Sequence, residues 1–337
     1  MIDLKTTYMG LPLKSPLVVS STPLSESPAN LRRMEESGAA AVVLTSIFEE
    51  QLALEARALN NDLERGADTN AEAATYLPEQ GDYRLTLDTC LQQIQTAKKT
   101  VSIPVIGSIN GASPGGWLRI AREVEQAGAD ALELNTYSLA IDPAIPGSKV
   151  EQNLLDLVRQ VRASIKIPLA VKLSTQFTSV PNLALQLDAL GVNGITLFNR
   201  FYQPNFDIET MSVVPRLAFS FSDELLLRLH WAAILYGHLR ADIAITGGIH
   251  TAEDVLKGVM AGAQVTMLAS ALHLHGIEHI ATIQNELVHW MEEHEFVSMN
   301  QMRGALSRNA VPDSSPFERG NYIKTLSAYT LRQPAMH

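Results

Sequence analysis

The sequence predicts an α/β protein in which eight parallel strands close into a (β/α)8 barrel, the TIM barrel. Short apolar runs alternate with amphipathic segments, and most of the runs are apolar on both faces, as buried parallel strands are. The 337 residues, of which 46% are hydrophobic, suffice for one such domain. The strands are expected at residues 17–21, 41–46, 104–108, 131–135, 169–173, 194–199, 243–246 and 265–269.

Three segments between the strands show the spacing of amphipathic helices, with apolar residues three or four positions apart. They cover residues 31–37, 120–127 and 183–190. The end of a helix often adopts a left-handed conformation that glycine reaches without strain. Glycines just past a helical segment and just before a strand therefore mark helix ends. These glycines are Gly38, Gly128, Gly191 and Gly262.

Three segments are longer than the usual connections between strands and helices. Residues 48–83 and 199–222 follow the second and sixth strands, at the end of a barrel where active sites lie. We interpret both as lids or substrate walls, and oligomer contacts or plain insertions are the alternative. The tail is expected to pack across the barrel or to reach a partner subunit. The predicted domain division is therefore residues 1–308 for the barrel and 309–337 for the C-terminal tail.

Composition and charge narrow the classes of function. The net charge of −10 argues against a surface for nucleic acid or for an anionic membrane. No apolar run approaches the ~18 residues that span a bilayer, and the N-terminal residues lack the features of a signal peptide, so a soluble cytoplasmic protein is expected. The single cysteine, Cys90, excludes an internal disulfide and is expected to be an inert packed thiol. The histidines lack zinc-site spacing, and no metal site is predicted.

The segment from residue 244 to 270 contains the strongest candidate for a ligand site. A predicted strand leads into Gly247 and Gly248 and then into a helix, and the next predicted strand ends at Ala269 and Ser270. Two adjacent turns of this kind direct backbone N–H groups and the positive ends of helix dipoles at one place, which suits a phosphate group. The alternative is that the glycine pair forms only a tight turn.

Motifs along the chain suggest a family. The segment Tyr8-Met9-Gly10-Leu11 precedes Lys14-Ser15-Pro16-Leu17, and Ala170-Val171-Lys172-Leu173 forms the fifth predicted strand. In this order they resemble the N-terminal hairpin, first strand and V-K-L segment of the FMN-dependent dihydroorotate dehydrogenase family, which includes the barrel domain of dihydropyrimidine dehydrogenase. The chain is most similar to a divergent bacterial branch called dihydroorotate dehydrogenase-like. The resemblance covers about residues 3–306 and implies a homodimeric flavoprotein of pyrimidine metabolism that binds FMN.

The resemblance also implies roles for individual residues. The lysine of the V-K-L segment lies beside the flavin ring in that family, so Lys172 would stabilise the negative charge that the ring gains on reduction. A salt-bridged or surface-reaching lysine is the alternative. By the same resemblance Asn135 contacts cofactor and substrate, and Asn199 binds the substrate. The other residues assigned to the FMN site are Ser20, Ser21, Thr45, Ser46, Asn110, Thr196, Gly247, Gly248, Ala269 and Ser270.

Departures from the family pattern concern the substrate. Thr45 and Ser46 stand where the family has a lysine, the orotate-binding asparagine is replaced near Ala73, and Ser138 falls where the catalytic base is expected. A serine is a weak base unless a neighbour takes its proton, so Tyr137 is the alternative acid or base. The resemblance therefore implies redox chemistry at a CH–CH bond next to a carbonyl, in a dihydropyrimidine or a related compound, without identifying orotate.

Such chemistry requires an electron acceptor. One cysteine cannot hold a conventional iron–sulfur cluster, so electrons are expected to leave to a soluble acceptor or to a partner protein. Two other functions stay open from the sequence. One is a phosphate-binding TIM-barrel lyase or isomerase without flavin, which would leave Lys172 without a ring to face. The other is a catalytically degenerate subunit that binds FMN and serves a partner.

Overall fold

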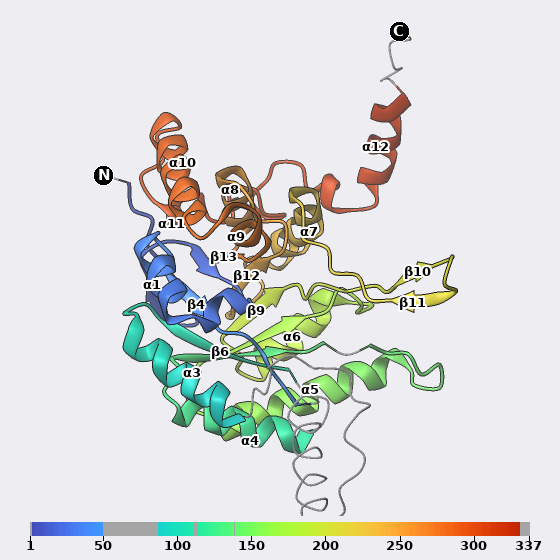
Figure 1. Cartoon of the computed structure of the whole chain (residues 1–337). Coiled ribbons are helices and arrows are strands. Elements are labelled where there is room, and N and C mark those ends of the chain that lie inside the picture. Colours follow the sequence, from blue (N-terminus) through green and yellow to red (C-terminus); the bar gives the residue numbers. More distant parts are fainter. Residues whose placement is uncertain (1, 50–86, 111–113, 138, 331–337) are drawn as a thin grey trace, which may run out of the picture.

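A computed structural model describes residues 2–49, 87–110, 114–137 and 139–330 of the chain. The predicted insertion at residues 48–83 lies almost wholly outside the described residues, and Ser138 and the end of the tail lie outside them too. Within the described part, eight parallel strands form a closed barrel with helices around it, which confirms the predicted fold (Figure 1).

The barrel strands neighbour one another in the order β3-β4-β6-β7-β8-β9-β12-β13, and β13 pairs with β3 to close the ring. All eight predicted strands are present. A short additional strand, β5 (Ile47–Phe48), extends the pairing along β6. The eight barrel strands are β3 (Leu17–Val19), β4 (Ala41–Val43), β6 (Val105–Asn110), β7 (Ala131–Asn135), β8 (Leu169–Leu173), β9 (Gly194–Leu197), β12 (Asp242–Thr246) and β13 (Val265–Leu268).

Several strands end earlier than the sequence predicts. The predicted ends at Ser21, Ser46 and Asn199 are wrong, because the ladders stop two or three residues sooner, as the bounds of β3, β4 and β9 show. At two of these ends, small polar side chains bond to one another where the sheet was predicted to continue. The backbone N–H of Ser46, for example, donates to the hydroxyl of Ser21 at 3.1 Å. These residues become available to line a cavity at this end of the barrel.

Helices cover the outside of the barrel, and those predicted at residues 31–37, 120–127 and 183–190 correspond to α1, α4 and α6. The four predicted helix-ending glycines all have positive φ, between 81° and 123°. The helices are α1 (Pro28–Glu36), α3 (Leu87–Thr100), α4 (Pro114–Gln126), α5 (Gly147–Ser164), α6 (Val180–Ala189), α7 (Leu225–Leu235), α8 (Ala252–Ala261), α9 (Ser270–His275), α10 (His279–Glu293), α11 (Met299–Met302) and α12 (Gly320–Thr330), with short 3-10 turns η1 (Pro23–Glu26), η2 (Ser222–Glu224) and η3 (Ser315–Phe317).

An N-terminal hairpin closes the barrel at the end opposite the cavity. Strands β1 (Thr6–Tyr8) and β2 (Leu11–Leu13) pair antiparallel, as the resemblance implied. Tyr8 and Met9 pack with small and branched residues of the barrel interior, among them Ala41 and Ala170. The N–H of Met9 donates to the carboxylate of Asp242, the first residue of β12, at 2.7 Å. The hairpin therefore lies at the N-terminal ends of the strands and leaves the other end open to ligands.

Two outer segments extend away from the barrel (Figure 1). In the predicted lid at residues 199–222, β10 (Asn205–Asp207) and β11 (Ser212–Val214) form an exposed hairpin that carries Phe206 and Met211. The tail first packs against α7, where the ring of Phe317 lies 6.2 Å from that of His230. The remainder forms α12, which projects outward and is exposed. Its reach to a partner subunit stays a prediction, as does the domain division.

Candidate active site

A cavity of about 420 Å³ opens at the C-terminal ends of the barrel strands. Its size falls in the usual range for small-molecule sites, and its position is where active sites of this fold lie. The structure brings to this cavity every predicted site residue that it describes except Thr196, which is buried beneath. The predicted residues that line the cavity are Ser20, Ser21, Thr45, Ser46, Asn110, Asn135, Tyr137, Lys172, Asn199, Gly247, Gly248, Ala269 and Ser270.

The charged side chains that line the cavity are all cationic among the described residues. They are Lys172, Arg200 and Arg228, and no described Asp or Glu lines it. The whole chain carries a net charge of −10, so the cavity has the opposite sign to the protein around it. Focused positive potential in a cleft attracts anions. The arrangement therefore suits an anionic ligand.

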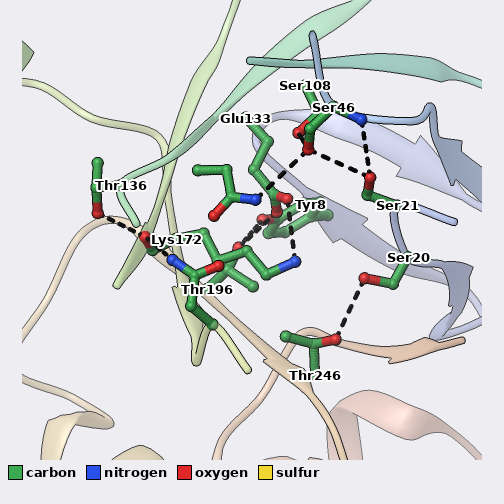
Figure 2. A network of polar contacts seen from close by, with 12 residues as sticks. Tyr8, Ser20, Ser21, Ser46, Ser108, Glu133, Thr136, Lys172, Thr196 and Thr246 are labelled. Carbon is green, nitrogen blue, oxygen red and sulfur yellow. Dashed lines mark hydrogen bonds and ion pairs between the residues drawn. The ribbon is translucent and has the colours of Figure 1, made fainter. Parts of the chain in front are cut away.

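Lys172 lies in β8 and belongs to a buried network that crosses the barrel (Figure 2). Its Nζ is 3.4 Å from Oε1 of Glu133, and the side chains are 9% and 1% exposed. The hydroxyl of Thr196 donates to the other oxygen of Glu133 at 3.0 Å and is 3.3 Å from the hydroxyl of Tyr8. Burial, reinforced by the negative charge of Glu133, raises the pKa of Tyr8, which keeps its phenol protonated.

This network changes the sequence interpretation at three residues. Thr196 supports the cavity from below, beside Glu133, and does not line it. Glu133 and Tyr8 were not predicted to take part. A signal for Glu133 existed, because a glutamate between two leucines of a buried strand needs a cationic partner, as Lys172 does. The structure shows that each supplies the other's counter-charge.

Serine side chains form a second polar wall of the cavity (Figure 2). The hydroxyl of Ser46 is 3.3 Å from that of Ser21 and 2.7 Å from that of Ser108. The Nδ2 of Asn135 donates to Ser46 at 3.4 Å, while its Oδ1 is buried and has no partner among the described residues. A buried acceptor without a donor is costly, so a ligand with an N–H group fits this place.

The strand-end segment after β9 forms the third wall. The Nδ2 of Asn199 donates to the backbone carbonyl of Lys172 at 3.2 Å, which fixes the orientation of the amide. Arg200 makes two bonds to the carboxylate of Glu224, at 2.9 and 3.0 Å. The hydroxyl of Tyr137 accepts a bond of 3.4 Å from the backbone N–H of Tyr202. Tyr137 thus stands at the cavity wall as predicted, although its role as acid or base stays a prediction.

The predicted phosphate-binding turns also line the cavity. Gly247 and Gly248 have φ values of 86° and 84°, which favour glycine, and Ser270 begins α9. Within the described chain, the N–H groups of Gly248 and Ser270 have no backbone acceptor. The hydroxyl of Ser270 accepts from the N–H of Ser220 at 3.1 Å, which holds the 219–222 segment beside the turns. The geometry agrees with an anion site, and its occupant stays a prediction.

The described residues contain no group of three or more His, Cys, Asp or Glu side chains placed to hold a metal ion. None of the helices in the described ranges is long and apolar enough to cross a bilayer.

Cys90 is buried on α3. His250, next to the glycine turn, is buried and lies 3.2 Å from the hydroxyl of Ser220.

A closed (β/α)8 barrel with a cavity at its strand ends places the chain in the class of TIM-barrel proteins, and the charged side chains that line the cavity are cationic among the described residues. Comparison with known proteins specifies the family. The family model described as dihydroorotate dehydrogenase matches residues 3–291. The chain therefore belongs to the dihydroorotate dehydrogenase family and is an oxidoreductase of that family.

Relatives come from archaea and from a plant. The chain is 25% identical over 324 residues to the dihydroorotate dehydrogenase B (NAD(+)) catalytic subunit of Thermoplasma acidophilum, covering 91% of this chain and 100% of the relative. For the protein of the same name from Methanocaldococcus jannaschii the identity is 25%, with 86% and 94% covered. The chloroplastic dihydropyrimidine dehydrogenase (NADP(+)) of Arabidopsis thaliana is 23% identical, with 90% and 76% covered. The assignment to a bacterial branch stays a prediction.

Proposed function

We propose that the chain binds FMN in the strand-end cavity and catalyses redox chemistry at a CH–CH bond next to a carbonyl. The observation that carries this proposal is the pairing of two features in one cavity. A buried ammonium, Lys172, stands at one side, and the anion-binding turns of Gly247, Gly248 and Ser270 stand at another. A lyase or isomerase that binds only a phosphate needs the turns as well, and in such a protein the pair of Lys172 and Glu133 would have a structural role alone. Membership of a family of oxidoreductases favours the flavin over this alternative.

The residues present fit FMN by their chemistry. Among the described residues, neither the Oδ1 of Asn135 nor the backbone N–H groups of Gly248 and Ser270 have a hydrogen-bond partner. The Oδ1 matches an N–H donor such as the flavin ring carries, and the N–H groups match the phosphate. The small serines that line the cavity leave room for a planar ring. When bound, FMN supplies a two-electron acceptor for the substrate C–H bond.

The chain's own residues orient charge and protons around that reaction. Lys172 places a positive charge where negative charge develops, which lowers the barrier by electrostatic stabilisation. The Nδ2 of Asn199 donates to the carbonyl of Lys172, and the second N–H and the Oδ1 of this amide can bond to the substrate. Either Tyr137 or Ser138 holds or accepts the substrate proton. Tyr137 is at the cavity wall, and Ser138 lies outside the described residues.

We infer a dihydropyrimidine or a related cyclic carbonyl compound as the substrate class. The names of the relatives include both a dihydroorotate and a dihydropyrimidine dehydrogenase, which share this type of bond. Thr45 and Ser46 add no charge beside the cavity, where the family pattern has a lysine. The hydroxyl of Thr45 donates to the backbone carbonyl of Thr22 at 3.0 Å. A homodimer is proposed, with electrons leaving to a soluble acceptor or to a protein partner, since several relatives are named catalytic subunits.

Two measurements test the proposed function. Purified protein is examined for visible flavin absorbance and titrated with FMN, and the loaded protein is then mixed without oxygen with a panel of dihydropyrimidines and related carbonyl compounds. We expect tight FMN binding and bleaching by at least one compound. Colourless protein that takes up no FMN would refute the flavin proposal and favour the lyase or isomerase. Bound FMN that nothing bleaches would instead favour the degenerate subunit.

A further inference from the structure

Arg228 is the least expected charge in the cavity wall. It lies in the first turn of α7 and is only 6% exposed, although no sequence motif identifies it. Burial lowers the pKa of its guanidinium, because the charged form loses water. The first turn of a helix also carries the positive end of the helix dipole, which opposes a cation. A buried arginine at such a place needs compensation from an anion.

No carboxylate among the described residues contacts Arg228, although the charge of Glu224 acts on it from a distance. Its Nε donates to the carbonyl of Thr246 at 3.2 Å and its Nη1 to the backbone carbonyl of Glu224 at 2.6 Å. The carboxylate of Glu224 is taken up by Arg200 instead. Arg228 forms no ion pair with any carboxylate in the described ranges. Of the three cations in the cavity wall, Lys172 and Arg200 have a carboxylate partner among the described residues, and Arg228 has none there.

The guanidinium of Arg228 lies directly against the anion-binding turns. A methyl group on Gly247 would come within 3.1 Å of its Nη2, and Thr246, whose carbonyl it bonds, is the residue before that glycine. Two of its three nitrogens are held by backbone carbonyls, which fixes the plane of the group. Nη2 has no hydrogen bond to a described residue, and Arg228 belongs to the wall of the cavity. A rigid guanidinium with one uncommitted edge matches the oxygens of a phosphoryl group.

We infer that Arg228 binds the phosphate of the cofactor and makes the site select phosphorylated flavin over riboflavin. This inference rests on the proposed binding of FMN. Backbone N–H groups alone provide a partial positive charge, whereas Arg228 contributes a full charge and directed bonds at a site shielded from water. The selectivity then arises because riboflavin would leave the buried cation without its counter-charge.

The test compares two ligands that differ only in the phosphate. Dissociation constants of FMN and riboflavin are measured by quenching of flavin fluorescence, for wild-type apoprotein and for Arg228→Gln, Arg228→Lys and Arg216→Gln. The exposed Arg216 controls for loss of one positive charge. For Arg228→Gln we expect FMN binding weakened about 10- to 100-fold and riboflavin binding nearly unchanged. Arg228→Lys should fall between, since lysine keeps the charge but loses the planar fork.

Inorganic phosphate supplies a second readout that involves no flavin. It should raise the Tm of wild-type apoprotein and leave that of Arg228→Gln almost unchanged. If Arg228→Gln does not fold, Arg228→Lys decides by the ratio of its FMN and riboflavin affinities. The role of Arg228 would be overturned if the wild type binds FMN but the variants weaken FMN and riboflavin equally, or weaken neither. The proposed function would then stay intact. Wild-type protein that binds neither flavin would overturn both.

Discussion

The buried pair of Lys172 and Glu133 permits a quantitative test of how the cavity is held together. Lys172→Met removes the cation with little change in length, and Glu133→Gln removes the anion while its amide oxygen still accepts the bond from Thr196. The double variant removes both charges. A double-mutant cycle on unfolding free energy then isolates the interaction between the two side chains.

The magnitude follows from the geometry. Two unit charges 3.4 Å apart attract by about 5 kcal/mol at an effective dielectric constant near 20, and the loss of water around both groups offsets much of this. Removing one partner leaves the other charge buried and uncompensated, at about 3–5 kcal/mol. We therefore expect each single variant to be strongly destabilised. The double variant should lose less than the sum of the two, by about 2–3 kcal/mol.

Urea unfolding of the four proteins without added flavin measures these free energies. An exposed pair supplies the control, because Arg33 and Glu278 are closer, at 2.7 Å, but their side chains are 49% and 64% exposed. Water screens that pair, so the same cycle at its two residues should be additive within error. If the cycle at Lys172 and Glu133 were equally additive, the two charges would not stabilise each other and the network described here would be wrong.

Two further predictions concern the turn at Gly247 and Gly248 and the histidine that follows it. Gly247→Ala and Gly248→Ala both place a side chain at positive φ and should each cost about 1–2 kcal/mol, but the methyl group of the second would lie 2.6 Å from the backbone nitrogen of Leu225. Urea unfolding should therefore show Gly248→Ala to be worse by about 1–3 kcal/mol, and equal losses would contradict the steric argument. Burial lowers the pKa of His250 below its ordinary value of 6.5. Below pH 6.5 the unfolded chain therefore binds more protons than the folded chain, and the free energy of unfolding falls as the pH drops. His250→Gln should reduce this acid sensitivity of the urea midpoint, and an unchanged pH profile would exclude His250 as its source.

Local features of the sequence predicted much of the fold. The barrel strands are apolar on both faces, and helices end at glycines with positive φ, namely Gly38, Gly128, Gly191 and Gly262. Both features depend on a few neighbouring residues, so the sequence is enough to predict them. The strand ends were harder to predict. Whether a polar residue continues a ladder or turns into the cavity depends on neighbouring strands that are distant in the chain.

Pairings across the barrel were the part that the sequence did not reveal. Glu133 and Lys172 are 39 residues apart, and they meet because β7 and β8 pair in a register that places Asn135 opposite Lys172. Arg228 was missed for a different reason. Its helix looks like an ordinary apolar helix, and only the packing of α7 against the turn at Gly247 directs the guanidinium into the cavity.

The distribution of partners among the cavity cations has a consequence for how a ligand is oriented. Among the described residues, Lys172 and Arg200 each contact a carboxylate, that of Glu133 and that of Glu224, whereas Arg228, beside the glycine turns, contacts none. The role inferred for Arg228 then predicts that a ligand with one anionic end binds with that end at Arg228. Its other end must then face the wall of Lys172 and Asn135. The order of charges along the cavity thus predicts one direction of binding, which the comparison of FMN with riboflavin tests.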